Sequence, residues 1–385
     1  MVYGKTILMA PGPTMVDYDV LLAMARPTIN HVSAEFDEIH REALGMLAEV
    51  FATKGRVIVI PGSGTSAMEL ALRSVVKPGS KVLVLKAGFF GDYLAQGVRY
   101  IGGEAIVVSS PVGRGFTPED LEEALKKHND VDIVALQHVE TSTSVANPIK
   151  ELAGAAKEHG LRIVVDGVAS IGGMEVRLDD WGIDACFTGS QKALGVPPGL
   201  GIVAFSREYS EELEKREGPW TLYFNVPKLL KEMESTRNYY VTPAVNLVYA
   251  LRESLKIIMN EGLEARYKRH KIMAEAVRAA LEGMGLRLVA EEGFRADTVT
   301  AAYIPEGIEW PKLYEGMRAR GIEIAGGLGE LKGRIFRIGH MGQTGYTDIA
   351  ATIAALERTL KTLGYDLRLG AGLEKMQEKL QEYGV

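Results

Sequence analysis

The sequence predicts an α/β protein, with a large domain built on a mostly parallel sheet with helices on both faces and a smaller α+β C-terminal domain. At 385 residues, the chain is long enough to bury the cores of two domains. From about residue 57 to residue 205, short apolar runs alternate with helical patterns, which is typical of a parallel sheet. After about residue 255 this alternation ends, which indicates a second domain of different architecture.

The large domain is predicted from apolar runs for its strands and from helical spacing of apolar residues for its helices. The strand candidates are 56–60, 81–85, 105–109, 131–138, 162–166, 183–187 and 202–205. The helix candidates between them are 66–76, 92–101, 118–127 and 149–159. Ligands of such sheets bind beyond the carboxyl ends of the strands. Gly62, Gly88, Glu140, Asp166 and Lys192 all fall at that edge.

The rest of the chain predicts a second, mixed domain. Residues 208–240 are polar and aromatic without a clear strand, and a long helical pattern runs from about 245 to 283. Further strand candidates lie at 286–290, 298–303 and 333–338, with a helix at 311–320 and two helices near the end. We therefore expect a large domain over 15–254 and a small domain over 255–385, with residues 1–14 packing near the small domain.

Composition narrows the class of protein. The net charge of −6 provides no basic field for nucleic acid or for an anionic membrane surface. No apolar run approaches the roughly 20 residues of a membrane span, and the first nine residues do not resemble a signal peptide. The single cysteine, Cys186, fits a reducing compartment, and no histidine or cysteine spacing suggests a metal site. We expect a cytoplasmic protein without nucleic-acid or membrane partners.

The strongest chemical signal is Lys192, on a turn between two strand candidates. Small and rigid residues surround it, from Thr188 to Gly199, and hold a tight path rather than a solvated helix face. A lysine amine at such a place can form a Schiff base with a carbonyl. Asp166 ends an earlier strand, and although a lone aspartate there often only caps a turn, its pairing with Lys192 favours a catalytic role. Pyridoxal phosphate (PLP) needs this pair, an amine for its aldehyde and a carboxylate for its ring nitrogen.

Residues 62–65, Gly-Ser-Gly-Thr, lie between a strand candidate and a helix candidate. The free N–H groups of a helix N-terminus can bind a phosphate, and small residues such as Ser63, Gly64 and Thr65 let it approach. A strand–helix turn with a capping hydroxyl is an equally good interpretation of this motif. The spacing alone leaves both open.

Three further residues carry a functional and a structural interpretation. Phe90 lies between glycines and either stacks on a flat ring or belongs to the core. The hydroxyl of Thr141 either caps the helix at 149–159 or binds a cofactor oxygen. Arg337 alternates with apolar neighbours on a strand, so it needs a partner, which is either a substrate carboxylate or an internal acid.

In this order along the chain, the motifs resemble those of the class V aminotransferases of the PLP fold-type I superfamily. The similarity is greatest to the alanine–glyoxylate and serine–glyoxylate (serine–pyruvate) aminotransferases and runs nearly end to end. It rests on Pro11–Thr14, 31–36, 62–69, 88–91, 138–143, 166–170, 189–199, 249–255 and 336–339. The family implies PLP as cofactor and a fold-type I architecture.

The resemblance assigns a role to each matching residue. Lys192 would bond to the cofactor and move the substrate proton, and Asp166 would pair with the ring nitrogen. The ring would lie between Val168 and Phe90, with Thr141 near its phenolate oxygen. The phosphate would be held by Ser63, Gly64, Thr65 and Gln191, and by Tyr239 and Thr242 of a neighbouring subunit, so a homodimer with shared active sites is implied. Arg337 would bind the substrate carboxylate, and the main chain of Gly12 would lie beside the substrate.

We therefore predict a PLP-dependent aminotransferase that moves an amino group from alanine or serine to glyoxylate or pyruvate. The alternatives are a family member with another donor, such as phosphoserine or aminoethylphosphonate, a PLP lyase or desulfurase, and a non-catalytic subunit. A second phosphate or phosphonate group would want extra cations, of which the sequence shows no cluster. A desulfurase needs a reactive cysteine on a mobile C-terminal loop, whereas Cys186 precedes Lys192 in an apolar run. A pure scaffold would have no need of Lys192, Asp166 and Arg337 together.

Overall fold

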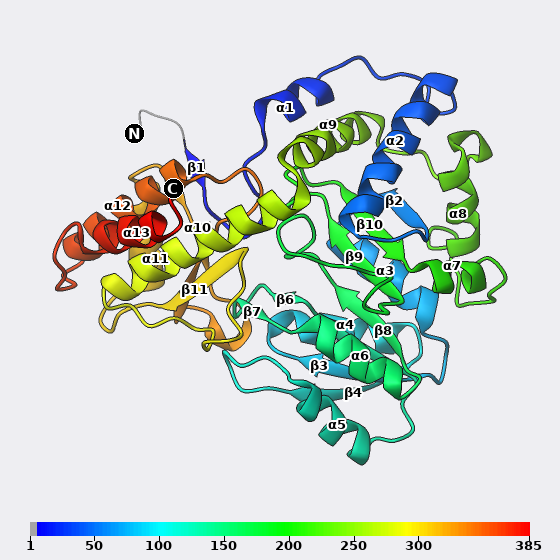
Figure 1. Cartoon of the computed structure of the whole chain (residues 1–385), viewed down its shortest axis with the longest axis horizontal. Coiled ribbons are helices and arrows are strands. Elements are labelled where there is room, and N and C mark those ends of the chain that lie inside the picture. The colour runs from blue at the N-terminus through cyan, green and yellow to red at the C-terminus, as the bar shows by residue number, and fades with distance from the viewer. Residues whose placement is uncertain (1–5) are drawn as a thin grey trace.

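A computed structural model describes residues 6–385, and Figure 1 shows its two parts, a large sheet with its helices and a smaller group of elements beside it. The large sheet has seven strands in the order β2-β10-β9-β8-β5-β3-β4. Only β10 runs antiparallel to its neighbours, β2 and β9, so the prediction of a mostly parallel sheet is confirmed. The strands are β2 (Val57–Pro61), β3 (Lys81–Lys86), β4 (Glu104–Ser109), β5 (Ile133–Gln137), β8 (Arg162–Asp166), β9 (Ala185–Gly189) and β10 (Leu200–Phe205).

Helices cover both faces of this sheet, as the sequence predicts. The central strands are buried and almost wholly apolar, as expected of strands with helices on both faces. One face packs against α2 (Ala34–Val50), α5 (Pro118–Lys127), α6 (Ile149–Glu158) and α9 (Val245–Glu261). The other packs against α3 (Gly64–Val75), α4 (Phe89–Tyr100), α7 (Arg207–Leu213) and α8 (Val226–Glu234).

The smaller part has a hydrophobic core of its own. Its three-stranded antiparallel sheet has the order β11-β14-β13, from Val299–Tyr303, Ile335–Gly339 and Ala325–Gly326. The helices around it are α10 (Leu263–Gly283), α11 (Trp310–Arg318), α12 (Tyr346–Thr362) and α13 (Ala371–Glu382). Strand β1 (Ile7–Leu8) pairs in parallel with β12 (Ile322–Glu323), so the N-terminal segment returns to this part. Residues 1–5, which belong to the segment expected there, lie outside the described residues.

Two predictions of secondary structure are wrong. The helical pattern over 245–283 forms two helices, α9 and α10, because Gly262 between them adopts φ +82, outside the helical region. The strand predicted at 286–290 forms only an isolated bridge between Leu288 and Ala302. Beyond it, the main chain leaves the sheet and the N–H of Glu291 donates to the carbonyl of Gly113 instead.

Several short elements complete the chain. Helix α1 (Tyr18–Met24) and helix α2 form where the sequence analysis expected no element, and Asp17 and Ser33 cap their N-termini. The remaining elements are β6 (Val139–Glu140), β7 (Val145–Ala146) and the 3₁₀ turns η1 (Thr236–Asn238) and η2 (Gly329–Leu331). Within residues 6–385, no helix combines the length and the apolar character needed to cross a membrane.

Candidate active site

One cavity of about 410 Å³ lies at the carboxyl edge of the large sheet, where the sequence places the functional residues. Strands β8 and β9 end there, α3 begins there, and the N-terminal loop closes over it. It gathers most of the predicted site residues: Gly12, Ser63, Gly64, Thr65, Phe90, Thr141, Asp166, Val168, Gln191 and Lys192.

Lys192 lies in the turn that joins β9 to β10. Its Nζ donates a hydrogen bond to the carbonyl of Pro11, and its own carbonyl accepts one from the hydroxyl of Thr14, 2.9 Å away. Burial lowers the pKa of Lys192 to about 8, the nearby charge of Arg337 acts in the same direction, and Asp166 and Glu140 oppose the shift. A lowered amine pKa favours the neutral, nucleophilic form.

Asp166 ends β8 and is 7% exposed. Its Oδ1 accepts a hydrogen bond from the N–H of Val168 at 2.9 Å. Burial raises the pKa of this carboxyl to about 7, the bond from Val168 and the charge of Lys192 act the other way, and the charge of Glu140 adds to the increase. A cation placed against Asp166 would reverse the effect of burial, because it stabilises the charged form.

The first turn of α3 faces the same cavity through Gly64 and Thr65. The N–H of Ser63 donates to the hydroxyl of Ser66 at 2.8 Å. This turn therefore has a side-chain cap, and it also lines the cavity. The space is tight, since a Cβ on Gly64 would lie 3.1 Å from a methyl group of Val168. First-turn N–H groups have no partner within a helix and are suited to a phosphate.

The amide of Gln191 adds an unsatisfied group at this place. Its Oε1 is buried and has no hydrogen-bond partner within residues 6–385. Rotating the amide by half a turn would present its NH₂ group there instead. Together with the amine of Lys192 and the buried acid of Asp166, this unsatisfied amide fits the aldehyde, ring nitrogen and phosphate of PLP.

Phe90 and Thr141 line the cavity as well. The N–H of Phe90, in the first turn of α4, donates to Oε2 of Glu140 at 2.9 Å. Phe89 and Tyr93 pack against the ring of Phe90, with centroids 5.4 and 5.9 Å away. The cluster holds the ring of Phe90 in place beside the cavity.

Arg337 is placed beside the cavity rather than in its wall. It lies on β14 and is 6% exposed. Its Nε donates to the carbonyl of Gly326 at 2.8 Å and its Nη1 to the carbonyl of Thr141 at 3.1 Å. Burial lowers the pKa of Arg337 to about 10, and the charge of Glu140 opposes this shift. Among the described residues no carboxylate forms an ion pair with Arg337, so the internal acid considered as its partner is not in contact.

Two predicted residues lie apart from this cavity. Tyr239 is 53% exposed, and its hydroxyl is 3.2 Å from that of Thr242. Neither residue lines the cavity of the same chain.

Sequence analysis missed several residues around the cavity. Met68 and Tyr93 line it because they follow Gly64 and Phe90 by one helical turn, a spacing that the sequence does contain. Pro13, Phe187 and Pro198 line it as well. Glu140 was noted only for its position at a strand end, although it is fully buried between Phe90 and the rest of the site.

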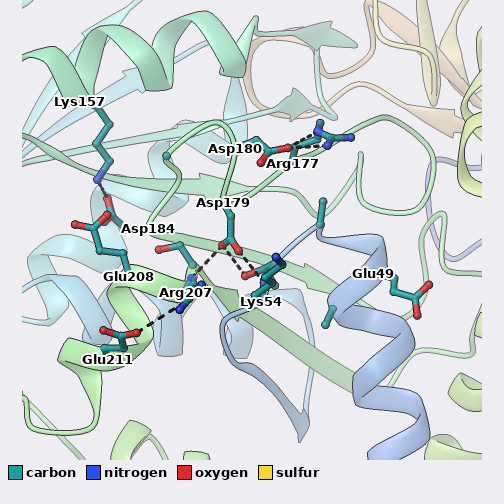
Figure 2. A pocket seen from close by; sticks show the side chains of 15 residues that line it. Glu49, Lys54, Lys157, Arg177, Asp179, Asp180, Asp184, Arg207, Glu208 and Glu211 are labelled. Carbon is teal, nitrogen blue, oxygen red and sulfur yellow. Dashed lines mark hydrogen bonds and ion pairs between the residues drawn. The ribbon is translucent and has the colours of Figure 1, made fainter.

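A larger cavity of about 730 Å³ lies at the other edge of the sheet, next to the start of β9 and the end of β10 (Figure 2). Several of its charged side chains form ion pairs with one another, as in the pairs Lys157–Asp184 and Arg177–Asp180. Asp179 accepts hydrogen bonds from the main chain of Lys54 and Arg207. These contacts hold loops together and assemble no catalytic group.

The chain is similar to known proteins along most of its length. Residues 14–330 match the family model described as aminotransferase class-V. An uncharacterized aminotransferase of Methanocaldococcus jannaschii is 41% identical, over 98% of each chain. The soluble hydrogenase small subunit of a Synechococcus strain is 36% identical, over 96% of this chain and 97% of that protein. The L-aspartate–glyoxylate aminotransferase of Paracoccus denitrificans is 34% identical, over 97% of this chain and 95% of that protein.

Two solved structures resemble the whole chain. The ureidoglycine–glyoxylate aminotransferase of Bacillus subtilis superposes with a TM-score of 0.93 and 33% identity, over 99% of each chain. The alanine–glyoxylate aminotransferase of a Nostoc species superposes with a TM-score of 0.88 and 35% identity, over 94% of this chain and 96% of that one.

Proposed function

Because this chain belongs to the class V aminotransferase family and is a PLP-dependent transaminase, we propose that it moves an amino group from a small amino acid, alanine or serine, to glyoxylate or pyruvate. The observation that carries the proposal is that Lys192 and Asp166 line one small cavity and that Arg337 lies beside it. When bound, PLP supplies an aldehyde that links to amines and a ring that accepts electrons.

In this proposal Lys192 holds the cofactor and moves the proton of the substrate. Its lowered pKa, about 8, supports both tasks, since the amine loses and regains a proton near neutral pH. Asp166 would pair with the ring nitrogen of the cofactor and keep it protonated. The phosphate would be bound by Ser63, Gly64, Thr65 and Gln191, the ring would be held by Val168 and Phe90, and Thr141 would bind the phenolate oxygen.

Arg337 binds the carboxylate that every amino-acid substrate carries. The carbonyls of Gly326 and Thr141 hold its Nε and Nη1, so the orientation of the guanidinium is fixed before the substrate arrives. Nη2 makes no hydrogen bond within residues 6–385 and is left for a ligand. A planar guanidinium suits a carboxylate, which it can bind through parallel hydrogen bonds. Gly12 lies beside the substrate through its main chain.

A small donor is supported by the walls of the cavity. Lys192 is the only cationic side chain among the residues that line it in the described structure. A distal carboxylate or phosphate would want a second cation there, so alanine and serine fit better than phosphoserine or aminoethylphosphonate. The relative named for aspartate makes aspartate the second candidate donor. Relatives named for ureidoglycine, alanine, serine and aspartate share glyoxylate in their names, which favours glyoxylate as the acceptor.

Two alternatives have less support. Cys186 is fully buried within β9 and burial raises its thiol pKa well above the ordinary value, so it is a poor nucleophile for a desulfurase. Two relatives are named as subunits of a soluble hydrogenase, which makes a non-catalytic role the other alternative. A non-catalytic subunit would have no use for the buried groups that converge at this cavity.

A homodimer with shared sites is part of the proposal. Tyr239 is exposed, its ring lies 5.2 Å from that of His31, and Tyr18, Leu21 and Leu22 on α1 are exposed as well. Exposed apolar side chains of this kind often mark a protein–protein interface. In a dimer, Tyr239 and Thr242 would reach the phosphate of the partner subunit. The compartment we propose is the cytoplasm, in keeping with a free, buried cysteine.

The deciding experiment is a panel of half-reactions. The purified holoenzyme is mixed with single amino acids, and the loss of its visible absorption band is followed. We expect alanine or serine to react fastest and glyoxylate to restore the band. A chain without a visible band after incubation with PLP would be non-catalytic, and a faster reaction with aspartate, glutamate or phosphoserine would refute the proposed donor.

A further inference from the structure

Glu140 is a fully buried acid that connects the start of α4 with the segment that follows β5. It is 0% exposed and lies on β6, just beyond the end of β5. Its Oε2 accepts a hydrogen bond from the N–H of Phe90 at 2.9 Å. Its Oε1 accepts two more from Ser142, from the N–H at 2.9 Å and from the hydroxyl at 2.7 Å. Burial raises the pKa of this carboxyl, and the donors on Ser142 and Phe90 oppose that shift by stabilising the ionised form.

These bonds provide the N-terminal cap of α4. The helix begins after Gly88, which has no side chain with which to cap it. The hydroxyl of Ser142 accepts from the N–H of Phe89 at 3.0 Å, and Glu140 accepts from the next N–H, that of Phe90. A carboxylate at this end of a helix is stabilised by unpaired N–H groups and by the helix dipole. Glu140 thereby fixes the turn that carries the ring of Phe90.

The space around Glu140 is fitted to it. A Cβ on Gly88 would lie 2.5 Å from the hydroxyl of Ser142 and 2.6 Å from Cγ of Glu140. Residue 88 must therefore lack a side chain for Glu140 to reach the start of α4.

Glu140 also provides the negative charge that balances Arg337. The guanidinium is held by two carbonyls, and the next residue after Glu140, Thr141, provides one of them. Among residues 6–385, Glu140 provides the charge that opposes the effect of burial on the pKa of Arg337. The charged groups that face Glu140 from the other elements are Asp166 on β8, Lys192 after β9 and Arg337 on β14.

We propose that Glu140 is a positioning residue that holds Phe90 against the cofactor and, by its charge, weakens the attraction of Arg337 for carboxylates. The inference rests on the proposed role of Arg337. A carboxylate that approaches Arg337 meets the field of Glu140 as well, so binding is weaker than to an isolated guanidinium. Weaker binding suits an enzyme that must release one 2-oxo acid before it binds another.

The test compares Glu140→Gln with Ser142→Ala, both as holoenzymes. Glu140→Gln removes the charge, whereas Ser142→Ala removes a capping hydroxyl and leaves the charge in place. The first readout is the pH titration of the visible band, which reports the bond between Lys192 and the cofactor. Loss of a negative charge should lower its midpoint by about one pH unit, the size of a Coulomb interaction over several ångströms at an effective dielectric constant near 20. Ser142→Ala should leave the midpoint unchanged.

The second readout is the binding of propionate, a carboxylate that cannot react. It should bind about tenfold more tightly to Glu140→Gln, which corresponds to the same Coulomb term, and with wild-type affinity to Ser142→Ala. If Glu140 were only a structural cap, Glu140→Gln and Ser142→Ala would have the same effect on the pH midpoint and on the affinity for propionate. An unchanged or higher midpoint, or weaker propionate binding, in Glu140→Gln would overturn the inference.

Arg337→Lys separates this inference from the proposed function. Propionate binding must weaken in this variant if Arg337 binds carboxylates, and unchanged binding would refute that role whatever Glu140 does. If Glu140→Gln does not fold, Glu140→Asp decides, because it keeps the charge. Its midpoint should then stay close to that of the wild type, and a fall of a full pH unit would overturn the inference.

Discussion

The main chain of Gly12 lies directly against the side chain of Lys192. A Cβ on residue 12 would lie 2.6 Å from Cδ and Cε of the lysine and 2.7 Å from its Nζ. Gly12 also adopts φ +120, a conformation that other residues rarely take. The N-terminal loop and the lysine therefore fit together only because residue 12 has no side chain.

Gly12→Ala should displace the amine of Lys192 and reduce kcat by about a hundredfold, the usual cost of a misplacement near 1 Å. The matched control is Gly45→Ala, at a helical position where an added Cβ meets no atom within 4 Å. The control should keep wild-type kcat and gain about 0.5–1 kcal/mol of stability, as alanine does in a helix. Steady-state kinetics and thermal unfolding of both variants check the prediction, and a fully active Gly12→Ala enzyme would contradict it.

Lys192→Ala should fold and lose turnover by orders of magnitude, because both the covalent link and the proton carrier are removed. Lys150→Ala, at an exposed position on α6, serves as the control and should be fully active. Borohydride reduction of the wild-type holoenzyme followed by peptide mapping should label Lys192. Labelling of any other lysine means that the assignment is wrong.

Asp166→Asn should keep the shape of the site but slow the first half-reaction far more than it weakens cofactor binding. The amide cannot hold the ring nitrogen protonated, so the ring becomes a poorer electron acceptor. Single-turnover rates and a cofactor titration measure the two effects separately. Near-normal turnover would rule out the role given to Asp166.

Asp166 also predicts how the stability of the apoenzyme depends on pH. Its pKa is about 7 in the folded chain against an ordinary value of 3.8, so the folded state binds more protons between these pH values. Its contribution to the free energy of unfolding therefore falls as pH rises from about 4 to 7, and then stays constant. Melting temperatures of wild-type and Asp166→Asn apoenzyme should diverge across this window in favour of the variant. Parallel curves would show that the carboxyl pKa is not raised.

Arg337→Lys should raise KM for the amino acid and lower kcat/KM by about tenfold to a hundredfold, since a lysine keeps the charge but loses the planar arrangement of donors. The estimate corresponds to about 1.5–3 kcal/mol for a hydrogen bond to a charged group. Arg334→Lys is the control, because Arg334 is exposed three residues earlier. Equal kcat/KM in the two variants would refute the role of Arg337.

Mixing two inactive proteins tests whether the sites are shared between subunits. Lys192→Ala and the double variant Tyr239→Phe/Thr242→Ala should together recover roughly a quarter of wild-type activity after subunit exchange, because one site of each hybrid dimer keeps both halves intact. Lys192→Ala mixed with itself should recover nothing. A fully active monomer in sedimentation experiments would exclude the shared site.

The sequence by itself determined the large sheet and much of the cavity. Strands such as Arg162–Asp166 are short apolar runs with polar ends, and this pattern is local. Because parallel strands end at one edge, Asp166 and Lys192 could be brought together without knowledge of their contacts. Helix α5 was predicted to the residue, since Thr117 and Pro118 mark its start within the sequence.

The features that depend on contacts between residues far apart in the sequence were decided only by the tertiary structure. The loss of the strand at 286–290 depends on which main-chain groups find partners, and the distant Gly113 is one of them. Arg337 contacts Thr141 although the two residues lie 196 positions apart in the sequence. The two interpretations of Arg337 could not be separated in the sequence, because a substrate carboxylate and an internal acid would both be bound by the same buried arginine. The burial of Glu140 at the start of α4 likewise follows from packing between segments, which residue spacing does not encode.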